Sequence, residues 1–528
     1  MKRAELLESL SRQSVYDLAV VGGGATGLGV ALDAALRGFS VVLLESHDFA
    51  GGTSSRSTKL LHGGVRYLAQ GNLALVREAL AERSTVLRMA PHLAQPLPFV
   101  MPSYRWWQTP FYGIGLKLYD LLAGAAGLGR TEFLNASSTL SALPGVQAQG
   151  LRGGVKYWDG QFDDARFALA LARTAEAAGA VILNYAGVTA IRRQADTARA
   201  RFEVDVRDHF SDKSFTVAAQ CVVNATGVWV DELRAATQGQ VPQAPPQRMV
   251  SPSQGVHVVV DHEFLGGETA LLVPKTPDGR VLFAVPWLGK VVLGTTDTPR
   301  QDLPREPQPF AEELDFILSE ASRALSRPVR REDVRSVWVG LRPLVAPPQN
   351  VQGSTKTLSR EHTIIADPNG LITVTGGKWT TYRAMAEDVL ERCFDEGFLP
   401  EKPGGLTERH AMLGAPGPSA AASPIFAAPG LHLYGTEAGR VNECPGADKL
   451  LGMGLTEAMV RFAVRHEYAQ TVEDVLARRW RVLYLDAAAA EAMAPGVAAI
   501  LGEEGCPSTR LEEFLRLCRH HVLPPQAI

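Results

Sequence analysis

The sequence predicts an α/β protein with a nucleotide-binding domain, a second domain built on an antiparallel sheet, and a helical C-terminal domain. Three observations predict this division. Residues 17–45 hold an apolar run, a glycine-rich turn, an apolar helix and a second apolar run. Between residues 248 and 344, short alternating apolar runs are separated by Gly and Pro, which is typical of an antiparallel sheet. After residue 431 the sequence is mostly helical, and its strongest helical pattern spans residues 461–486.

The first element fits a Rossmann-type unit. The strand Asp17–Val21 leads into a turn with G-x-G-x-x-G spacing, followed by the helix Ala25–Arg37 and a second strand, Ser40–Leu44. The first glycine of such a turn permits the bend, the second lets a pyrophosphate approach the backbone, and the third lets helix and strand pack closely. The helix N-terminus stabilises phosphate charge, and an acid after the second strand accepts hydrogen bonds from a ribose. We therefore expect a dinucleotide to be bound by Gly22, Gly24, Ala25, Thr26, Gly27 and Glu45.

A segment rich in hydroxyl groups follows this unit and indicates which dinucleotide is bound. Thr53–Thr58 carries five Ser or Thr side chains and runs into His62-Gly63-Gly64. FAD lies extended, so its pyrophosphate, ribityl chain and ring need further donors, whereas a nicotinamide enzyme does not need this segment. The sequence therefore predicts FAD as the cofactor. The residues expected to contact it here are Thr53, Ser54, Ser57, His62, Gly63 and Gly64.

Two blocks in this region resemble a known family. TSSRSTKLLHGGVRYL (53–68) and EALAERSTVLRMAPHL (78–93) are similar to the signature of the FAD-dependent, membrane-associated glycerol-3-phosphate dehydrogenases of the aerobic pathway. The resemblance covers roughly residues 16–490 and implies a DAO/glutathione-reductase-like flavoprotein fold. It implies oxidation of sn-glycerol 3-phosphate to dihydroxyacetone phosphate, with membrane quinone as electron acceptor and a homodimer as a further expectation. It also leads us to expect Val188, Ala225 and Gly227 close to FAD.

The substrate should be an anion, and the candidate cations lie in or near two glycine-rich turns. The turns are His62–Tyr67 and Gly376–Thr381; the second precedes a helix whose N-terminus can stabilise the negative charge of a reduced flavin. Arginine suits a phosphate because its planar fork binds two oxygens, while lysine acts as a point charge. The residues expected to bind cofactor or substrate here are Arg66, Tyr67, Arg342, Gly377, Lys378 and Thr381.

Oxidation of a secondary alcohol also requires a base for the hydroxyl proton. His257 lies on a predicted strand of the antiparallel-sheet domain and has a suitable pKa range, so it is the candidate base. A core histidine satisfied by hydrogen bonds is the alternative interpretation. Arg342 is a second catalytic candidate, since it could lie closer to the reacting hydroxyl than to the phosphate. We interpret Asp297 as structural.

These motifs divide the chain into regions. We assign residues 1–75, 150–235 and 345–400 to the FAD-binding domain, 236–344 to the substrate domain, 401–430 to a linker, and 431–528 to the helical domain. Residues 76–149 are expected to be a helical region. The helical stretch Leu73–Met89 leads into it, and a Pro-rich crossing, Pro91–Pro102, follows that stretch. Within this region, 104–129 holds six aromatic residues with basic residues nearby, which suits a helix in a bilayer interface; a helix packed on the protein's own core is the alternative.

The composition excludes several classes of protein. With 46% hydrophobic residues, 21% charged residues and a net charge of −3, the chain gives no case for a nucleic-acid partner. Five scattered cysteines suggest neither a disulfide framework nor a metal site. We find no secretory signal and no transmembrane window, so we expect a cytoplasmic protein. The family resemblance implies that it is attached peripherally to the cytoplasmic face of the inner membrane. Three alternatives remain: a glycerol-3-phosphate oxidase that uses O₂, an amine or amino-acid oxidase of the same fold, and a flavin-binding protein without catalysis.

Overall fold

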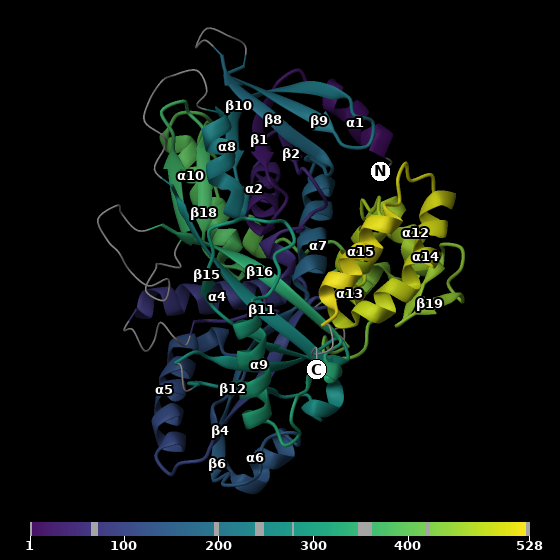
Figure 1. Cartoon of the computed structure of the whole chain (residues 1–528). Helices are drawn as coiled ribbons and strands as arrows, with labels where there is room; N and C mark the ends of the chain where they lie inside the picture. Colours follow the sequence, from purple (N-terminus) through teal and green to yellow (C-terminus); the bar gives the residue numbers. More distant parts are fainter. Residues whose placement is uncertain are drawn as a thin grey trace.

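The chain folds around two large sheets, with a group of helices from its C-terminal part packed beside them (Figure 1). The computed structural model describes residues 3–64, 72–194, 200–237, 248–276, 279–346, 362–417 and 423–523. The predicted α/β class, with a flavoprotein-type nucleotide domain and a helical C-terminal domain, is confirmed.

The first sheet is the predicted nucleotide-binding sheet. Its parallel core has the order β18-β10-β1-β2-β7, and the helix α2 lies between α7 and α10 against it. The strands β1 and β2 are almost wholly apolar, as expected for parallel strands covered on both faces. The strands of this sheet are β1 Tyr16–Val21, β2 Val41–Leu44, β7 Val181–Leu183, β8 Ala186–Arg193, β9 Phe202–Asp208, β10 Ser214–Asn224, β17 His362–Ala366 and β18 Ile372–Gly376. Its helices are α1 Arg3–Arg12, α2 Ala25–Leu36, α7 Asp164–Ala177, α8 Val230–Thr237 and α10 Tyr382–Asp395.

The strand β10 joins the β8–β9 hairpin to this sheet. Its first half, Ser214–Ala219, pairs antiparallel with β9, and its second half, Ala219–Asn224, pairs parallel with β1. The β8–β9 hairpin therefore extends the nucleotide-binding sheet and forms no separate small sheet. The end of β10 delivers residues 225–227 to the carboxyl edge of the parallel strands.

The second sheet differs from the sequence-based division. It has the order β15-β11-β14-β13-β12-β4-β6-β3, with β16 on β11 and β5 on β6. Among the described residues, its neighbouring strands are antiparallel except for β12 and β4, which are parallel. Residues 76–149 are thus not only helical: β4 and β5 lie in this sheet, and so does β6, which we assigned to the FAD-binding domain. The strands are β3 Leu60–Leu61, β4 Ala94–Ser103, β5 Glu132–Asn135, β6 Gly153–Phe162, β11 Val250–Asp261, β12 Ala270–Val273, β13 Leu282–Trp287, β14 Lys290–Gly294, β15 Thr298–Pro299 and β16 Ser336–Val345. The helices beside it are α4 Leu73–Met89, α5 Gln108–Ala123, α6 Ala136–Ala142 and α9 Ala311–Ala324.

The Pro-rich segment forms β4 because of where its prolines fall. Pro96, Pro98 and Pro102 alternate with residues of the other parity, so their missing N–H groups lie on one edge of the strand. The other edge keeps its donors and pairs with β6 over all ten residues. On the proline side β12 pairs only with Phe99 and Val100. Prolines at every second position are therefore compatible with a strand that is paired along one edge, although the Pro-rich sequence suggests an irregular crossing.

The C-terminal helices form the third region. Residues 461–486 are not one helix, as the sequence pattern suggests: α12 ends at His466, and Arg481 adopts a left-handed conformation with φ of 65°. The carboxylate of Asp474, the first residue of the intervening π-helix, accepts hydrogen bonds from the backbone N–H groups of Gln470 (2.8 Å) and Thr471 (3.0 Å) and so holds the turn that precedes this helix. The elements are η9 Leu431–Glu437, α11 Ala438–Asn442, β19 Leu450–Gly452, β20 Leu455–Thr456, α12 Glu457–His466, the π-helix η10 Asp474–Arg479, α13 Val482–Leu485, α14 Ala487–Glu503 and α15 Leu511–His521.

Candidate active site

A large cavity lies where the carboxyl ends of the parallel strands meet the second sheet. Its volume is about 1640 Å³, above the range of roughly 300–1,000 Å³ for ordinary small-molecule pockets, so it can hold an extended dinucleotide and a substrate together. Residues at the ends of β1, β2, β10 and β18 line one part of it. Residues of β11 and β16, and Thr295–Asp297 after β14, line another. The strand order changes direction at β1, between β2 and β10, which is where open α/β sheets bind ligands.

The first glycine turn has the geometry that the motif predicts. Gly22 has a φ of 110°, and a Cβ there would lie 2.6 Å from the carbonyl oxygen of Ala225. A Cβ at Gly27 would lie 1.9 Å from the carbonyl oxygen of Gly22, so Gly27 serves the contact between helix and strand and does not line the cavity. The carboxylate of Glu45 lines the cavity and accepts hydrogen bonds from the N–H groups of Gly23 (2.7 Å) and His47 (2.8 Å).

The hydroxyl-rich segment lies along the cavity and is fixed at both ends. Ser54 Oγ accepts a hydrogen bond from Ala25 N (3.0 Å) at the start of α2, and Thr53 Oγ1 donates to Leu341 O on β16 (2.6 Å). Ser57 Oγ donates to Asp164 (2.7 Å). The segment thus connects the nucleotide-binding sheet with the second sheet, next to the space that FAD requires.

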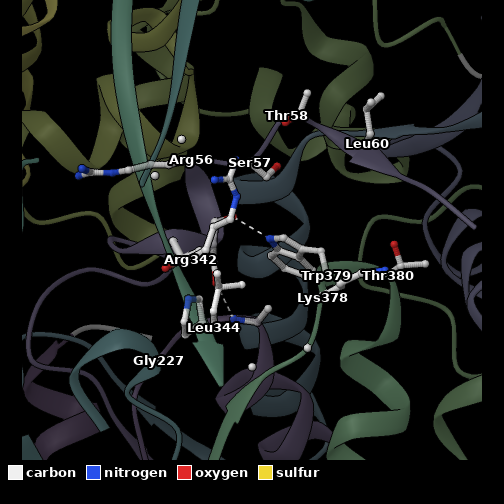
Figure 2. A pocket seen from close by; sticks show the side chains of 18 of the residues that line it. Arg56, Ser57, Thr58, Leu60, Gly227, Arg342, Leu344, Lys378, Trp379 and Thr380 are labelled. Atoms are coloured by element: carbon white, nitrogen blue, oxygen red, sulfur yellow. Dashed lines mark hydrogen bonds between the residues drawn. The ribbon is translucent and has the colours of Figure 1, made fainter. Parts of the chain in front are cut away.

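The second glycine turn follows β18 and also lines the cavity; Figure 2 shows Lys378, Trp379 and Thr380 of this turn. Gly376 and Gly377 have φ values of 84° and 71°, a conformation that residues with a Cβ rarely adopt. The turn leads through the short helix Trp379–Thr381 into α10. The indole N–H of Trp379 donates to Ser54 O (2.9 Å; dashed line in Figure 2), so the turn is bonded to the hydroxyl-rich segment.

The structure brings most of the predicted site residues together. Those that line the cavity are Gly22, Gly24, Ala25, Thr26, Glu45, Thr53, Ser54, Ser57, His62, Gly64, Val188, Ala225, Gly227, His257, Arg342, Gly377 and Lys378. Gly63 does not, because it packs on α5: a Cβ there would lie 2.2 Å from the hydroxyl of Tyr119. Thr381 does not line it either, and its hydroxyl donates to Lys378 O (3.4 Å). Arg66 and Tyr67 lie outside the described residues.

These residues fit FAD. The lining combines four features that FAD requires. It has two helix N-termini and a glycine turn with positive φ, which leaves the backbone open to a ligand. It also has hydroxyl donors along the segment Thr53–Thr58 and an acid at the end of β2. Backbone N–H groups at helix N-termini suit the pyrophosphate and a reduced ring, and the acid suits a ribose.

His257 is buried at the inner wall, with only 2% of its surface exposed. Its Nε2 lies 2.9 Å from the hydroxyl of Thr58, and its ring stacks on Trp338 at 5.3 Å between centroids. Burial, and then the charges of Lys59 and Arg342, hold the pKa of His257 well below its ordinary value. The ring is therefore neutral at pH 7 and able to accept a proton.

Arg342, on β16, presents its guanidinium at the cavity wall. Nη2 donates to Thr296 O (2.9 Å) and Thr295 Oγ1 (3.1 Å), and Nη1 donates to Gln254 O (3.2 Å). Asp297, which we interpreted as structural, lines the cavity and lies 3.4 Å from Nη1. Three neutral acceptors and one carboxylate hold the guanidinium in place, which leaves it suited to an anionic ligand.

Sequence reasoning missed several lining residues. Thr58 lies within the hydroxyl-rich segment, but its hydrogen bond to the candidate base depends on the fold and could not be predicted from the sequence. Trp379 stood within the second glycine turn. Arg305 gave no signal: it lies in a loop between β15 and α9 and folds back so that its Nη2 donates to Ser46 Oγ (3.0 Å) beside Glu45.

Comparisons with known proteins agree with this geometry. Residues 17–386 match the family "FAD dependent oxidoreductase", and residues 419–506 match "C-terminal domain of alpha-glycerophosphate oxidase". The chain is 39% identical to a mitochondrial glycerol-3-phosphate dehydrogenase of Macaca fascicularis, over 95% of this chain and 72% of the relative. It is 39% identical to a mitochondrial glycerol-3-phosphate dehydrogenase of Arabidopsis thaliana, over 92% and 82% respectively. The crystal structure of the glycerol-3-phosphate dehydrogenase from Bacillus halodurans complexed with FAD matches with a TM-score of 0.77 and 28% identity, over 100% of this chain and 99% of that one.

Proposed function

The chain belongs to the family of FAD-dependent glycerol-3-phosphate dehydrogenases, and on that premise we propose that it oxidises sn-glycerol 3-phosphate to dihydroxyacetone phosphate and passes the electrons to a membrane quinone. One observation carries the proposal: a neutral histidine, a guanidinium and a lysine line the same cavity as the residues that fit FAD. When bound there, FAD supplies the acceptor for the hydride that leaves C2 of the substrate.

Thr58 and His257 accept the proton of the substrate C2 hydroxyl. Because His257 is almost fully buried and Thr58 lines the cavity, the C2 hydroxyl reaches the base through the Thr58 hydroxyl. Thr58 accepts the substrate proton and gives its own to His257 Nε2. Such general-base catalysis contributes typically about 10²–10⁴-fold.

The substrate anion is bound by the cations at the wall. Arg342 supplies a fork that matches two phosphate oxygens, and Lys378 supplies a second charge from the glycine turn. Arg66 and Tyr67 remain predicted substrate ligands.

An anaerobic titration tests the reaction. Adding sn-glycerol 3-phosphate to the purified yellow protein should bleach the visible flavin band, whereas its enantiomer, sn-glycerol 1-phosphate, should not. Bound FAD that this substrate fails to bleach would contradict the proposal; bleaching by an amino acid or amine in its place would establish the oxidase alternative.

An exposed apolar helix supports the proposal that the electron acceptor is a membrane quinone. Along α5 and the residues before it, Trp106, Ile114 and Leu121 are 79%, 70% and 76% exposed, and Phe111 and Leu118 lie on the same side. Its other face, with Leu116 and Tyr119, is buried against the protein. Within the described ranges, every helix is too short or too polar to cross a lipid bilayer. An apolar face of this kind suits a helix that lies in the membrane interface.

The cavity itself supports quinone as the acceptor. Phe111, Ile114 and Leu118 line it, and further apolar residues behind them, Phe99 and Phe283, line it too. An apolar molecule dissolved in the bilayer could thus enter beside α5 and approach the cofactor without crossing water. We propose attachment at the cytoplasmic face of the inner membrane; a homodimer remains a prediction.

Liposomes test the attachment and the acceptor. Replacing Trp106 and Trp107 with Ser should release the protein from sedimenting liposomes and slow quinone reduction, while the flavin is still bleached at the normal rate. Leu450→Ser, which removes an exposed apolar side chain from β19, is the matched control and should change neither. Undiminished sedimentation of the Trp variant would contradict the anchor. Faster reoxidation by O₂ than by quinone would identify an oxidase.

A further inference from the structure

Three buried arginines of the C-terminal region contact residues 48–55, a stretch that runs along the cofactor cavity: Arg478, Arg479 and Arg481. Arg478 and Arg479 both pair with Asp48, three residues after Glu45. Burial alone would raise the pKa of Asp48, but Arg479 and Arg478 bring it below its ordinary value. This contact fixes the loop that follows β2, near the nucleotide end of the cavity.

Arg481 contacts the other end of this stretch, at Ser55. Its Nη2 donates to Ser55 O (2.8 Å) and to Asp164 Oδ1 (3.1 Å). Lys59 Nζ donates to the same two residues, at 2.8 Å to Ser55 O and 2.7 Å to Asp164 Oδ2. The side chains of Arg481, Asp164 and Lys59 are all fully buried. Two cations thus share one carboxylate and one backbone carbonyl underneath the hydroxyl-rich segment.

Two contacts lead from this cluster to the candidate base. Thr58, between Ser57 and Lys59, holds His257 Nε2 at 2.9 Å. Trp338 stacks on the His257 ring, and Lys59 Nζ lies 5.3 Å from the centroid of the Trp338 ring. A displacement of Ser55–Lys59 would therefore move the proton relay and one neighbour of the His257 ring together.

We propose that Arg481 is a positioning residue of the active site, through which the C-terminal domain holds the segment Thr53–Lys59 and thereby the Thr58–His257 pair. The proposal rests on the proposed function of that pair. It gives the C-terminal domain a part in the reaction, although none of its residues lines the described cavity.

The charged groups around His257 allow a positioning role to be distinguished from an effect on the pKa of the histidine. Lys59 and Arg342 face the ring, while Asp164, Asp163 and Arg481 face Lys59. Burial and then the charge of Arg481 lower the pKa of Lys59 to about 7, although Asp164 opposes them. Lys59→Met removes a positive charge beside His257, so the pKa of the histidine should rise. The acid limb of the rate of flavin reduction should then move to higher pH.

Arg481→Lys is the positioning test, carried out on the full-length holoenzyme. A lysine keeps the charge but has no planar fork to serve Ser55 O and Asp164 together. The maximal rate of flavin reduction should fall about tenfold, within the loss of about a hundredfold that a misplacement of 1 Å can cause. The apparent affinity for glycerol 3-phosphate and the acid limb should stay unchanged. A wild-type rate would overturn the proposal.

Arg173→Lys is the matched control, because this arginine is also buried and also joins the nucleotide-binding sheet to the C-terminal region, but it holds Glu437 (2.8 Å) instead. After reconstitution with FAD its rate should be that of the wild type; a loss equal to that of Arg481→Lys would indicate general destabilisation and contradict the proposal.

A double-mutant cycle tests the route. If Arg481 acts through Thr58, the double variant Arg481→Lys/Thr58→Val should be no slower than Thr58→Val alone, whereas additive losses would contradict that route. Wild-type protein that glycerol 3-phosphate fails to bleach would refute the proposed function, while normal bleaching in wild type and Arg481→Lys alike would refute this inference alone.

Discussion

The two ends of the cavity are built in different ways. The nucleotide end is made of backbone: Gly22 and Gly24 form a turn at a helix N-terminus, and Glu45 holds that turn by accepting a hydrogen bond from the N–H of Gly23. The substrate end is made of side chains from distant strands, with His257 on β11 and Arg342 on β16. A backbone site requires one conformation, so a change there should remove the cofactor altogether. A side-chain site can lose one group and keep its shape, so a change there should lower a rate.

The strongest test of this difference is Gly27→Val. The added side chain must enter space held by the carbonyl oxygen of Gly22, only 1.9 Å from an ideal Cβ, so the turn and the helix must separate. We expect protein without FAD and without activity, measured as the ratio of flavin to protein absorbance. Gly439→Ala is the control, since a Cβ there meets nothing within 4 Å. Full FAD content in Gly27→Val would break the distinction.

Arg342→Ala should have the next largest effect. Removing the guanidinium takes away a charged ligand of the substrate, and the value of kcat/KM should fall about a thousandfold while FAD is retained. Steady-state kinetics with a flavin spectrum check both statements. Arg335→Ala is the control, because Arg335 pairs with Asp261 (2.6 Å) at the surface, just before the same strand. Near-normal turnover in Arg342→Ala would remove Arg342 from the site.

His257→Gln should slow flavin reduction at saturating substrate by about a hundredfold. Glutamine can keep a hydrogen bond to Thr58 but cannot act as the base. Stopped-flow absorbance measures the rate, and His262→Gln, at a histidine bonded to Gly267 O, should behave as wild type. If only the apparent affinity changes, His257 is a core histidine, the alternative interpretation.

A smaller change is expected from Glu45→Gln at the nucleotide end. The neutral amide weakens the two N–H contacts and any bond to a ribose, and a hydrogen bond to a charged group contributes about 1.5–3 kcal/mol. Because 1.4 kcal/mol is a factor of ten, the Kd for FAD should rise about tenfold or more. Titration of apoprotein with FAD measures it; an unchanged Kd would show that the backbone holds the turn without this acid.

The mildest test changes only the pH. Since the pKa of His257 lies well below 6.5, the ring stays neutral at pH values where an exposed histidine is already protonated. The rate of flavin reduction should therefore hold as the pH falls to 6.5 and decline only below it. A decline centred above pH 6.5 would mean that a different group is the base.

The nucleotide end could be predicted from sequence because its residues are close together in the chain. The spacing of three glycines, the helix after them and the acid after the next strand all lie within residues 17–45, and FAD followed from the adjacent hydroxyl-rich segment. The family is confirmed.

The rest depends on contacts between distant residues, which spacing does not show. The segment 94–103 looked like a crossing because its three prolines suggest irregular backbone, and only the partner β6 makes it a strand. Arg481 lies 426 positions from Ser55, and its role depends on the fold of a domain whose pattern suggested an unbroken helix. Gly63 and Thr381 were assigned to ligands by their motifs, but tertiary packing directs Gly63 to Tyr119 and Thr381 to its own turn.

The apolar face of α5 also decides which concentration governs turnover. If it holds the enzyme at the bilayer surface, the enzyme meets glycerol phosphate arriving from the water in three dimensions and quinone diffusing in the plane of the lipid in two. The rate should then depend on the mole fraction of quinone in the lipid and fall when inert lipid is added at constant total quinone, a surface dilution that no buffer volume can imitate.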